Sequence, residues 1–175
     1  MTKRLILATA AVLLLAAPAV AQDPAKPSPV TDPATRVLID MLDHCLATME
    51  GKVDYDKGAQ KKGWGRTGNG GWGKKVGKSM MATELAITNL ASGSFRVCAV
   101  NMAPASVDVP GLKAVLAERA APYPLTPVAP RLDKRGGTQS GFENPKGPLI
   151  GLTITEMPAV GELPPKTFLS VIWRE

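Results

Sequence analysis

Residues 45–98 read CLATMEGKVDYDKGAQKKGWGRTGNGGWGKKVGKSMMATELAITNLASGSFRVC, and they begin and end at the only two cysteines of the chain. The stretch starts inside a segment with the 3.6-residue apolar period of a helix and ends inside a segment that alternates like a strand. Between the two lies a run rich in glycine, lysine and tryptophan. A Cys45–Cys98 disulfide would therefore join a helix to a sheet across the most unusual part of the sequence.

The N-terminus has the pattern of a secretory signal peptide. Lys3 and Arg4 precede the apolar run 5–17, and residues 19–21 read AVA, a small-x-small cleavage site. The alternative is an uncleaved membrane anchor, but the run is too short to span a bilayer. We expect residues 1–21 to be removed, and the mature chain to be periplasmic or secreted, with no transmembrane segment.

Export changes what the two cysteines imply, because an oxidising compartment lets thiols persist as a disulfide. A pair that closes a loop of this length stabilises the folded state by about 4 kcal/mol in the chain-entropy estimate. The alternative is two buried, unpaired thiols. We expect the disulfide.

Three helices are predicted. Asp32 offers an N-cap and Pro33 suits a first turn, and Gly51 is placed to end the first helix. A short helix at 55–62 follows Asp54, and a third helix begins after Asp108 and ends at Pro122. The first helix has an apolar stripe that comprises Val37, Leu38, Met41, Leu42, Cys45, Leu46 and Met49.

Strands are predicted at 80–88 and 95–102, around a turn at Ser92-Gly93, and at 149–156 and 167–173. Proline and glycine predict a loop over 122–148, with a short edge strand near 128–132. Hairpins that alternate with helices favour an α+β fold. We expect residues 32–175 to form a single α+β domain with an antiparallel sheet of four to five strands and helices packed on one face. We expect residues 22–31 to form a flexible, proline-rich lead.

Several common kinds of site lack support. The run from Gly73 to Ser79 ends like a phosphate-binding loop, but its first glycine comes one residue too late and no strand leads into it. His44 is the only histidine, so it has no partners for a triad or a zinc site, and it is interpreted as a helix-flank residue. Met80 and Met81 alternate on a strand and are expected in packing. We expect no metal and no cofactor.

Paired carboxylates are the remaining candidates for catalysis. Asp54 with Asp56, or Asp40 with Asp43, could supply the two acids of a glycoside hydrolase. Asp54 is also a good helix cap, and the other three lie on solvated helix faces. No catalytic residue is assigned.

The strongest feature is a basic, aromatic loop at 64–77, predicted to be mobile or hairpin-like. The chain has 21 basic and 15 acidic residues, and loss of Lys3 and Arg4 leaves 19 against 15, a net charge of +4. Residues 52–78 alone contain eight basic and two acidic residues, or +6. The combination of charge and indole rings suits a flat ligand or an anionic surface. The candidate binding residues are Lys61, Lys62, Trp64, Arg66, Trp72, Lys74, Lys75 and Lys78. The alternative is that the tryptophans cover the core while the lysines only solvate a loop.

The positions of Cys45, the Gly63-Trp64 pair and Cys98 resemble a group of small exported proteins of proteobacteria, which have a cysteine on the first helix, Gly-Trp after a short second helix and a cysteine on a strand. The resemblance covers residues 33–102. It implies no activity, cofactor or partner, because the group has none to carry over.

These patterns favour an exported, non-catalytic protein that binds an anionic cell-envelope component or an acidic protein through the loop. Nucleic acid is not expected, because no nucleic-acid-binding module is present. The alternative is a small cell-envelope hydrolase that uses carboxylates the sequence does not identify. A third possibility is a structural or stress-related protein without a dedicated ligand.

Overall fold

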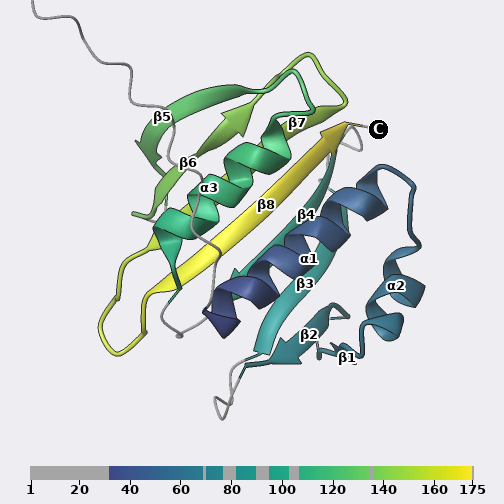
Figure 1. Ribbon diagram of the computed structural model, residues 1–175. Helices are drawn as coiled ribbons and strands as arrows, with labels where there is room; N and C mark the ends of the chain where they lie inside the picture. The colour runs from purple at the N-terminus through teal and green to yellow at the C-terminus, as the bar shows by residue number, and fades with distance from the viewer. Residues whose placement is uncertain are drawn as a thin grey trace, which may run out of the picture.

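The computed structural model describes residues 32–68, 70–76, 82–89, 95–102, 107–134 and 136–174. The predicted signal peptide and lead lie outside these ranges, as do Lys78, Met80, Met81 and the predicted Ser92-Gly93 turn. The described residues form three helices and one eight-stranded antiparallel sheet in a single α+β domain. The predicted fold class is confirmed (Figure 1).

The first helix, α1, spans Pro33–Met49 and begins as its sequence predicts. The Asp32 carboxylate accepts a hydrogen bond from the backbone N–H of Thr35 at 2.7 Å, which caps the first turn. Gly51 has a φ of 71°, the left-handed conformation that follows many helix ends. All of the predicted apolar stripe is buried except Val37, which is partly buried. One face of α1 therefore lies in the core.

The strand order in the sheet is β1-β2-β3-β4-β8-β7-β6-β5. The last strand, β8, therefore lies between β4 and β7 and joins an N-terminal half of the sheet to a C-terminal half. The strands span Gly65–Arg66, Trp72–Lys75, Ala82–Asn89, Phe95–Met102, Thr126–Leu132, Thr138–Glu143, Leu149–Met157 and Lys166–Arg174, from β1 to β8.

Both long helices cover the same face of the sheet. In Figure 1, α1 lies across β4 and β8, and α3 (Val109–Ala120) lies across β6 and β7. The short helix α2 (Tyr55–Lys61) packs beside α1 near the β1 edge. Alternate residues of the central strands are fully buried among these elements, namely Cys98, Val100, Leu152, Ile154, Leu169 and Val171. Each large apolar side chain in this layer contributes about 1.5–3 kcal/mol relative to exposure.

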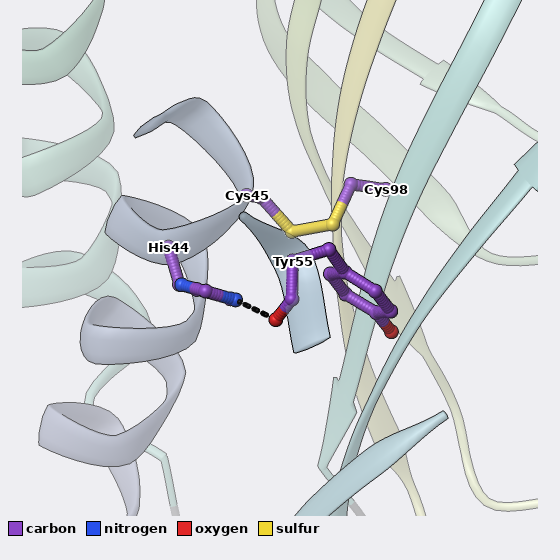
Figure 2. The surroundings of a disulfide bond; sticks show 4 residues. All are labelled: His44, Cys45, Tyr55 and Cys98. Carbon is purple, nitrogen blue, oxygen red and sulfur yellow. Dashed lines mark hydrogen bonds between the residues drawn. A yellow bond between two sulfur atoms is a disulfide. The ribbon is translucent and has the colours of Figure 1, made fainter. Parts of the chain in front are cut away.

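The predicted disulfide is confirmed. Cys45 of α1 is bonded to Cys98 of β4, with their Cα atoms 5.7 Å apart, and both side chains are fully buried. Figure 2 shows the bond crossing from the helix to the sheet. It ties the helical layer to the sheet layer at the centre of the core.

The sheet is wider than the sequence predicts, because hairpins extend it at both edges. The predicted loop over 122–148 contains the hairpin of β5 and β6, and β6 pairs along most of β7. Gly141 allows this pairing, since a Cβ at that position would lie 2.2 Å from the carbonyl oxygen of Leu152. β5 is the edge strand, and Pro127 and Pro130 suit an edge because proline has no N–H to donate.

At the other edge, β1 and β2 pair antiparallel and β2 pairs with β3. The predicted loop over 64–77 is therefore a hairpin over its described residues. In the described part of the chain, no helix is both long and apolar enough to cross a membrane.

Candidate functional site

Helix α2 leads directly into the hairpin that carries the basic residues. Asp54 caps the helix by accepting a hydrogen bond from the backbone N–H of Lys57 at 2.8 Å. Gly63 has a φ of 70° and turns the chain out of the helix, so that Trp64 follows with its N–H donating to Ala59 at 3.1 Å. We call β1 and β2, together with Gly63 and Trp64, the basic hairpin. Its position depends on how α2 is held.

His44 holds α2 against α1. Its side chain is only 3% exposed, and its Nε2 lies 3.0 Å from the carbonyl oxygen of Tyr55 (Figure 2). Since a carbonyl can only accept, Nε2 carries the proton. The ring of Trp64 meets the imidazole edge to face at a centroid distance of 5.1 Å, and Tyr55 lies at 5.9 Å. His44 is therefore a core residue that joins three elements, rather than the helix-flank residue expected from the sequence.

Burial lowers the pKa of His44 below its ordinary value of 6.5, because desolvation penalises the imidazolium form. The hydrogen bond to Tyr55 and the carboxylate of Asp40 oppose this change, while the ammonium of Lys62 adds to it. The imidazole is therefore kept neutral.

Both tryptophans of the predicted site are buried. Trp64 is 4% exposed and Trp72 is 3% exposed, and the indole N–H of Trp72 donates to Asp56 at 2.9 Å. The structure therefore has the alternative arrangement, in which the indole rings cover the core. A ligand at this surface would meet basic side chains and backbone rather than indole faces.

Two of the predicted basic residues are already paired with carboxylates. Lys62 forms an ion pair with Asp40, and its ammonium lies 5.3 Å from the ring of Trp64. Arg66 lies 2.9 Å from Asp56 and 4.2 Å from the centre of the Trp72 ring. Arg66 also donates to the carbonyl of Gly70 at 2.8 Å, so its side chain is fixed on the hairpin.

The other predicted basic residues that the structure describes are exposed. Lys61, Lys74 and Lys75 all point to solvent, and within the described residues no ion pair holds any of them. They therefore provide the uncompensated positive charge of this surface. Lys61 lies at the end of α2, and Lys74 and Lys75 lie together at the end of β2.

A groove of about 280 Å³ runs along the basic hairpin. Gly65 and Gly73, which are partners across the two strands, both line it, and of the two Gly65 is exposed while Gly73 is buried. A Cβ on Gly63 or Gly65 would meet no other atom within 4 Å. The hydroxyl oxygen of Thr67 is buried and, among the described residues, has no hydrogen-bond partner. The residues that line the groove are Gly63, Gly65, Arg66, Thr67, Gly73, Lys74 and Lys75. Gly63 and Gly65 leave the backbone open to a close approach. Arg66, which is paired with Asp56, and the exposed Lys74 and Lys75 are the basic side chains of the groove.

The four carboxylates considered for catalysis all make structural contacts. Asp43 accepts two hydrogen bonds from Arg119, at 2.6 and 3.1 Å. Asp54 caps α2, Asp40 pairs with Lys62, and Asp56 binds both Arg66 and Trp72. None of them lines the groove. Among the described residues there is also no cluster of three or more His, Cys, Asp or Glu side chains that could hold a metal ion.

Sequence reasoning did not identify how two residues shape this site, although Asp56 was considered there as a catalytic acid. Asp56 fixes Arg66 and Trp72 together, and Gly58 lets α2 approach α1 closely enough for His44 to fit between them. A glycine inside a seven-residue helix is a signal for such a close approach, because glycine weakens a helix.

Comparisons of this chain with protein-family models, with curated proteins and with solved structures found no match.

Proposed function

We propose that this protein is an exported, non-catalytic binding protein, and that its basic hairpin holds an anionic component of the cell envelope. The groove over Gly65 and Gly73, bordered by Arg66, Lys74 and Lys75, is the observation that carries the proposal. The signal-peptide pattern supports export, and the buried disulfide is compatible with an oxidising compartment.

The groove suits an anion for two reasons. Unpaired lysines attract negative charge over a distance of about 8–10 Å at physiological ionic strength. The exposed Gly63 and Gly65 then let a phosphate or carboxylate group approach the backbone beside Arg66, which Asp56 and Trp72 hold in place. A fixed guanidinium loses little side-chain entropy on binding, and the N–H groups that Asp56 and Gly70 do not use can donate to such a group.

The buried tryptophans support a rigid site. Trp64 and Trp72 anchor the two strands of the basic hairpin in the core, so the hairpin does not need to fold when a ligand binds. A preorganised surface avoids part of the ordering cost of association.

The test is co-sedimentation of the mature chain with anionic vesicles, lipopolysaccharide and peptidoglycan fragments, at low and high salt. The variant Lys74→Gln/Lys75→Gln removes two charges from the groove. Each lysine near an anionic surface is worth about 1 kcal/mol, so we expect about 30-fold weaker binding. Binding by the natural chain should also weaken as salt rises.

The matched control is Lys134→Gln/Lys146→Gln. These lysines are exposed in the β5–β6 and β6–β7 turns, near the opposite edge of the sheet from the basic hairpin. The control removes the same net charge and should keep its binding. If both variants lose the same affinity, binding depends on the net charge of the protein and not on the groove. If the natural chain binds none of the three materials, the proposal is wrong.

A further inference from the structure

A second surface, distant from the basic hairpin, lies at one end of the sheet. Among the described residues, the large hydrophobic side chains that are exposed are Val53, Leu132, Val160 and Leu163, at 39%, 78%, 59% and 62%. The last three gather at the same end. One row of paired residues crosses four strands at this end of the sheet, and it runs from Leu132 through Thr138 and Glu156 to Thr167. The β7–β8 turn, which carries Val160 and Leu163, connects the last two strands of this row just beyond Glu156 and Thr167.

The β7–β8 turn projects beyond the sheet at the lower left of Figure 1. Val160 and Leu163 exchange two backbone hydrogen bonds of 3.0 Å, and Gly161 between them has a φ of 58°. Proline at 158, 164 and 165 restricts the backbone on both sides. The turn is therefore a firm projection with two apolar side chains at its tip.

A cleft of about 470 Å³ lies beside this projection. Val107 and Val109 line it at the start of α3, and Met157, Pro165 and Lys166 line it at the ends of β7 and β8. The walls are mostly apolar. Their charged residues are Lys166 and Glu156, and the carboxylate of Glu156 is paired with Lys113, so that Lys166 brings the positive charge. The cleft can receive apolar side chains that approach with a carboxylate.

The tip of the β7–β8 turn combines apolar side chains with a carboxylate, because the exposed Glu162 lies between Gly161 and Leu163. A projection and a matching hollow on one surface are what an interface with twofold symmetry requires, since each copy must present both halves. We propose that this end of the sheet joins two copies of the chain, with the tip of each copy, Val160, Glu162 and Leu163, in the cleft of the other.

The local charges favour a second copy over an anionic surface. Near the projection, the charges of Asp133 and Glu162 offset those of Lys134 and Lys166, and Glu156 is paired with Lys113. In the sequence, Arg135 adds one positive charge, which leaves a net charge of about +1. The end of the sheet therefore has little net charge to attract a lipid surface or a strongly charged partner. The opposite signs of Glu162 and Lys166 instead suit a contact between copies.

The experiment is sedimentation equilibrium of the mature chain from nanomolar to high micromolar concentration. We expect a reversible dimer, and we expect Val160→Asp/Leu163→Asp to shift the chain to monomer throughout this range. Val53→Asp is the matched control, because Val53 is the exposed hydrophobic residue that lies elsewhere, between α1 and α2. It should leave the dimerisation constant unchanged.

Charge reversal tests the orientation of the contact. Glu162→Lys and Lys166→Glu should each weaken the dimer by about tenfold or more, and the double variant should recover most of the loss. Circular dichroism should show the natural fold for every variant, because these side chains are on the surface. A chain that stays monomeric at all concentrations overturns the proposal, even if the tip then binds vesicles or another protein. A dimer that Val160→Asp/Leu163→Asp leaves intact overturns it as well.

Discussion

The Nε2 atom of His44 lies 3.0 Å from the carbonyl oxygen of Tyr55, and this contact fastens α2 to α1. Because α2 leads into Trp64 and β1, the same contact sets where the basic hairpin meets the rest of the sheet. A buried imidazole that donates to a backbone carbonyl thus connects the core to the proposed binding surface. Its protonation state should therefore affect stability.

The stability of the protein should fall on acidification below pH 6.5. The folded-state pKa of His44 lies below 6.5, so the unfolded chain takes up the proton first as the pH falls. Stability from the neutral ring is complete above pH 6.5 and is lost as the pH falls toward the folded-state pKa. Urea unfolding at a series of pH values measures this slope.

The control for this slope is His44→Gln, which keeps a side-chain N–H donor for Tyr55 but does not titrate. We expect a lower stability at neutral pH and a flatter dependence between pH 7 and 5 than in the natural chain. Identical slopes for the two proteins would assign the pH dependence to other groups.

Gly58→Ala should destabilise the protein by about 1–3 kcal/mol, although alanine is the better helix former by about 1 kcal/mol. The added Cβ would lie 2.5 Å from Cε1 of His44, which closes the space between the two helices. Thermal or urea unfolding measures the change. The control is the same substitution in a His44→Ala background, which lacks the ring. In that background Gly58→Ala should leave the free energy of unfolding unchanged or raise it. If Gly58→Ala still lowers the free energy of unfolding, the clash is not with His44.

Removal of the disulfide by Cys45→Ala/Cys98→Ala should lower the free energy of unfolding by about 4 kcal/mol. The bond closes a loop with a sequence separation of 53 residues, so its loss frees a long segment of the unfolded chain. Urea unfolding of the oxidised protein and the double variant gives the difference. Alkylation of both cysteines in denatured but unreduced protein would contradict the bond itself.

Tyr123 should titrate with a pKa of about 12, because partial burial and a 2.6 Å hydrogen bond to Glu50 both favour its neutral form. The ultraviolet absorbance of tyrosinate measures this titration. Tyr123→Phe should remove the component near pH 12, and Glu50→Gln should move it only part of the way toward 10, since burial is the larger cause. A component at pH 12 that survives in Tyr123→Phe would belong to the other tyrosine.

Much of the fold follows from local patterns. The caps at Asp32, Asp54 and Asp108 all accept hydrogen bonds from the backbone N–H three residues later, as side chains of this type do at helix starts. The strand at Phe95–Met102 agrees with the prediction because its apolar alternation reports the buried face directly. The strand at Leu149–Met157 agrees because an apolar, β-branched run bounded by proline is typical of a strand that is buried on both faces.

The β6 strand was not predicted, because its sequence, TQSGFE, has neither an apolar run nor β-branched residues beyond the first. It is a strand because β7 is buried on both sides and needs a hydrogen-bonding neighbour. The burial of His44 likewise depends on a neighbouring element. Its place at the edge of the apolar stripe did not show that α2 would cover it.

The candidate site was predicted as a set of residues but not as an arrangement. The basic cluster was evident in the sequence, and a hairpin was one of the two settings predicted for it, the other being a mobile loop. The structure divides the set, with Trp64 and Trp72 in the core, Lys62 and Arg66 paired with carboxylates, and Lys61, Lys74 and Lys75 exposed. Lys78 lies outside the described residues.

The sequence by itself determined the helices, the central strands, the Cys45–Cys98 pairing and the location of excess positive charge, because each depends on local spacing or on the count of one residue type. Only the tertiary structure decided that the indole rings face inward, that Gly65 meets Gly73 under a groove, and that Leu132 joins Val160 and Leu163 at one end of the sheet. These relationships depend on how each segment packs against the rest of the chain, and they arise when the core closes and each side chain is either covered or left in water.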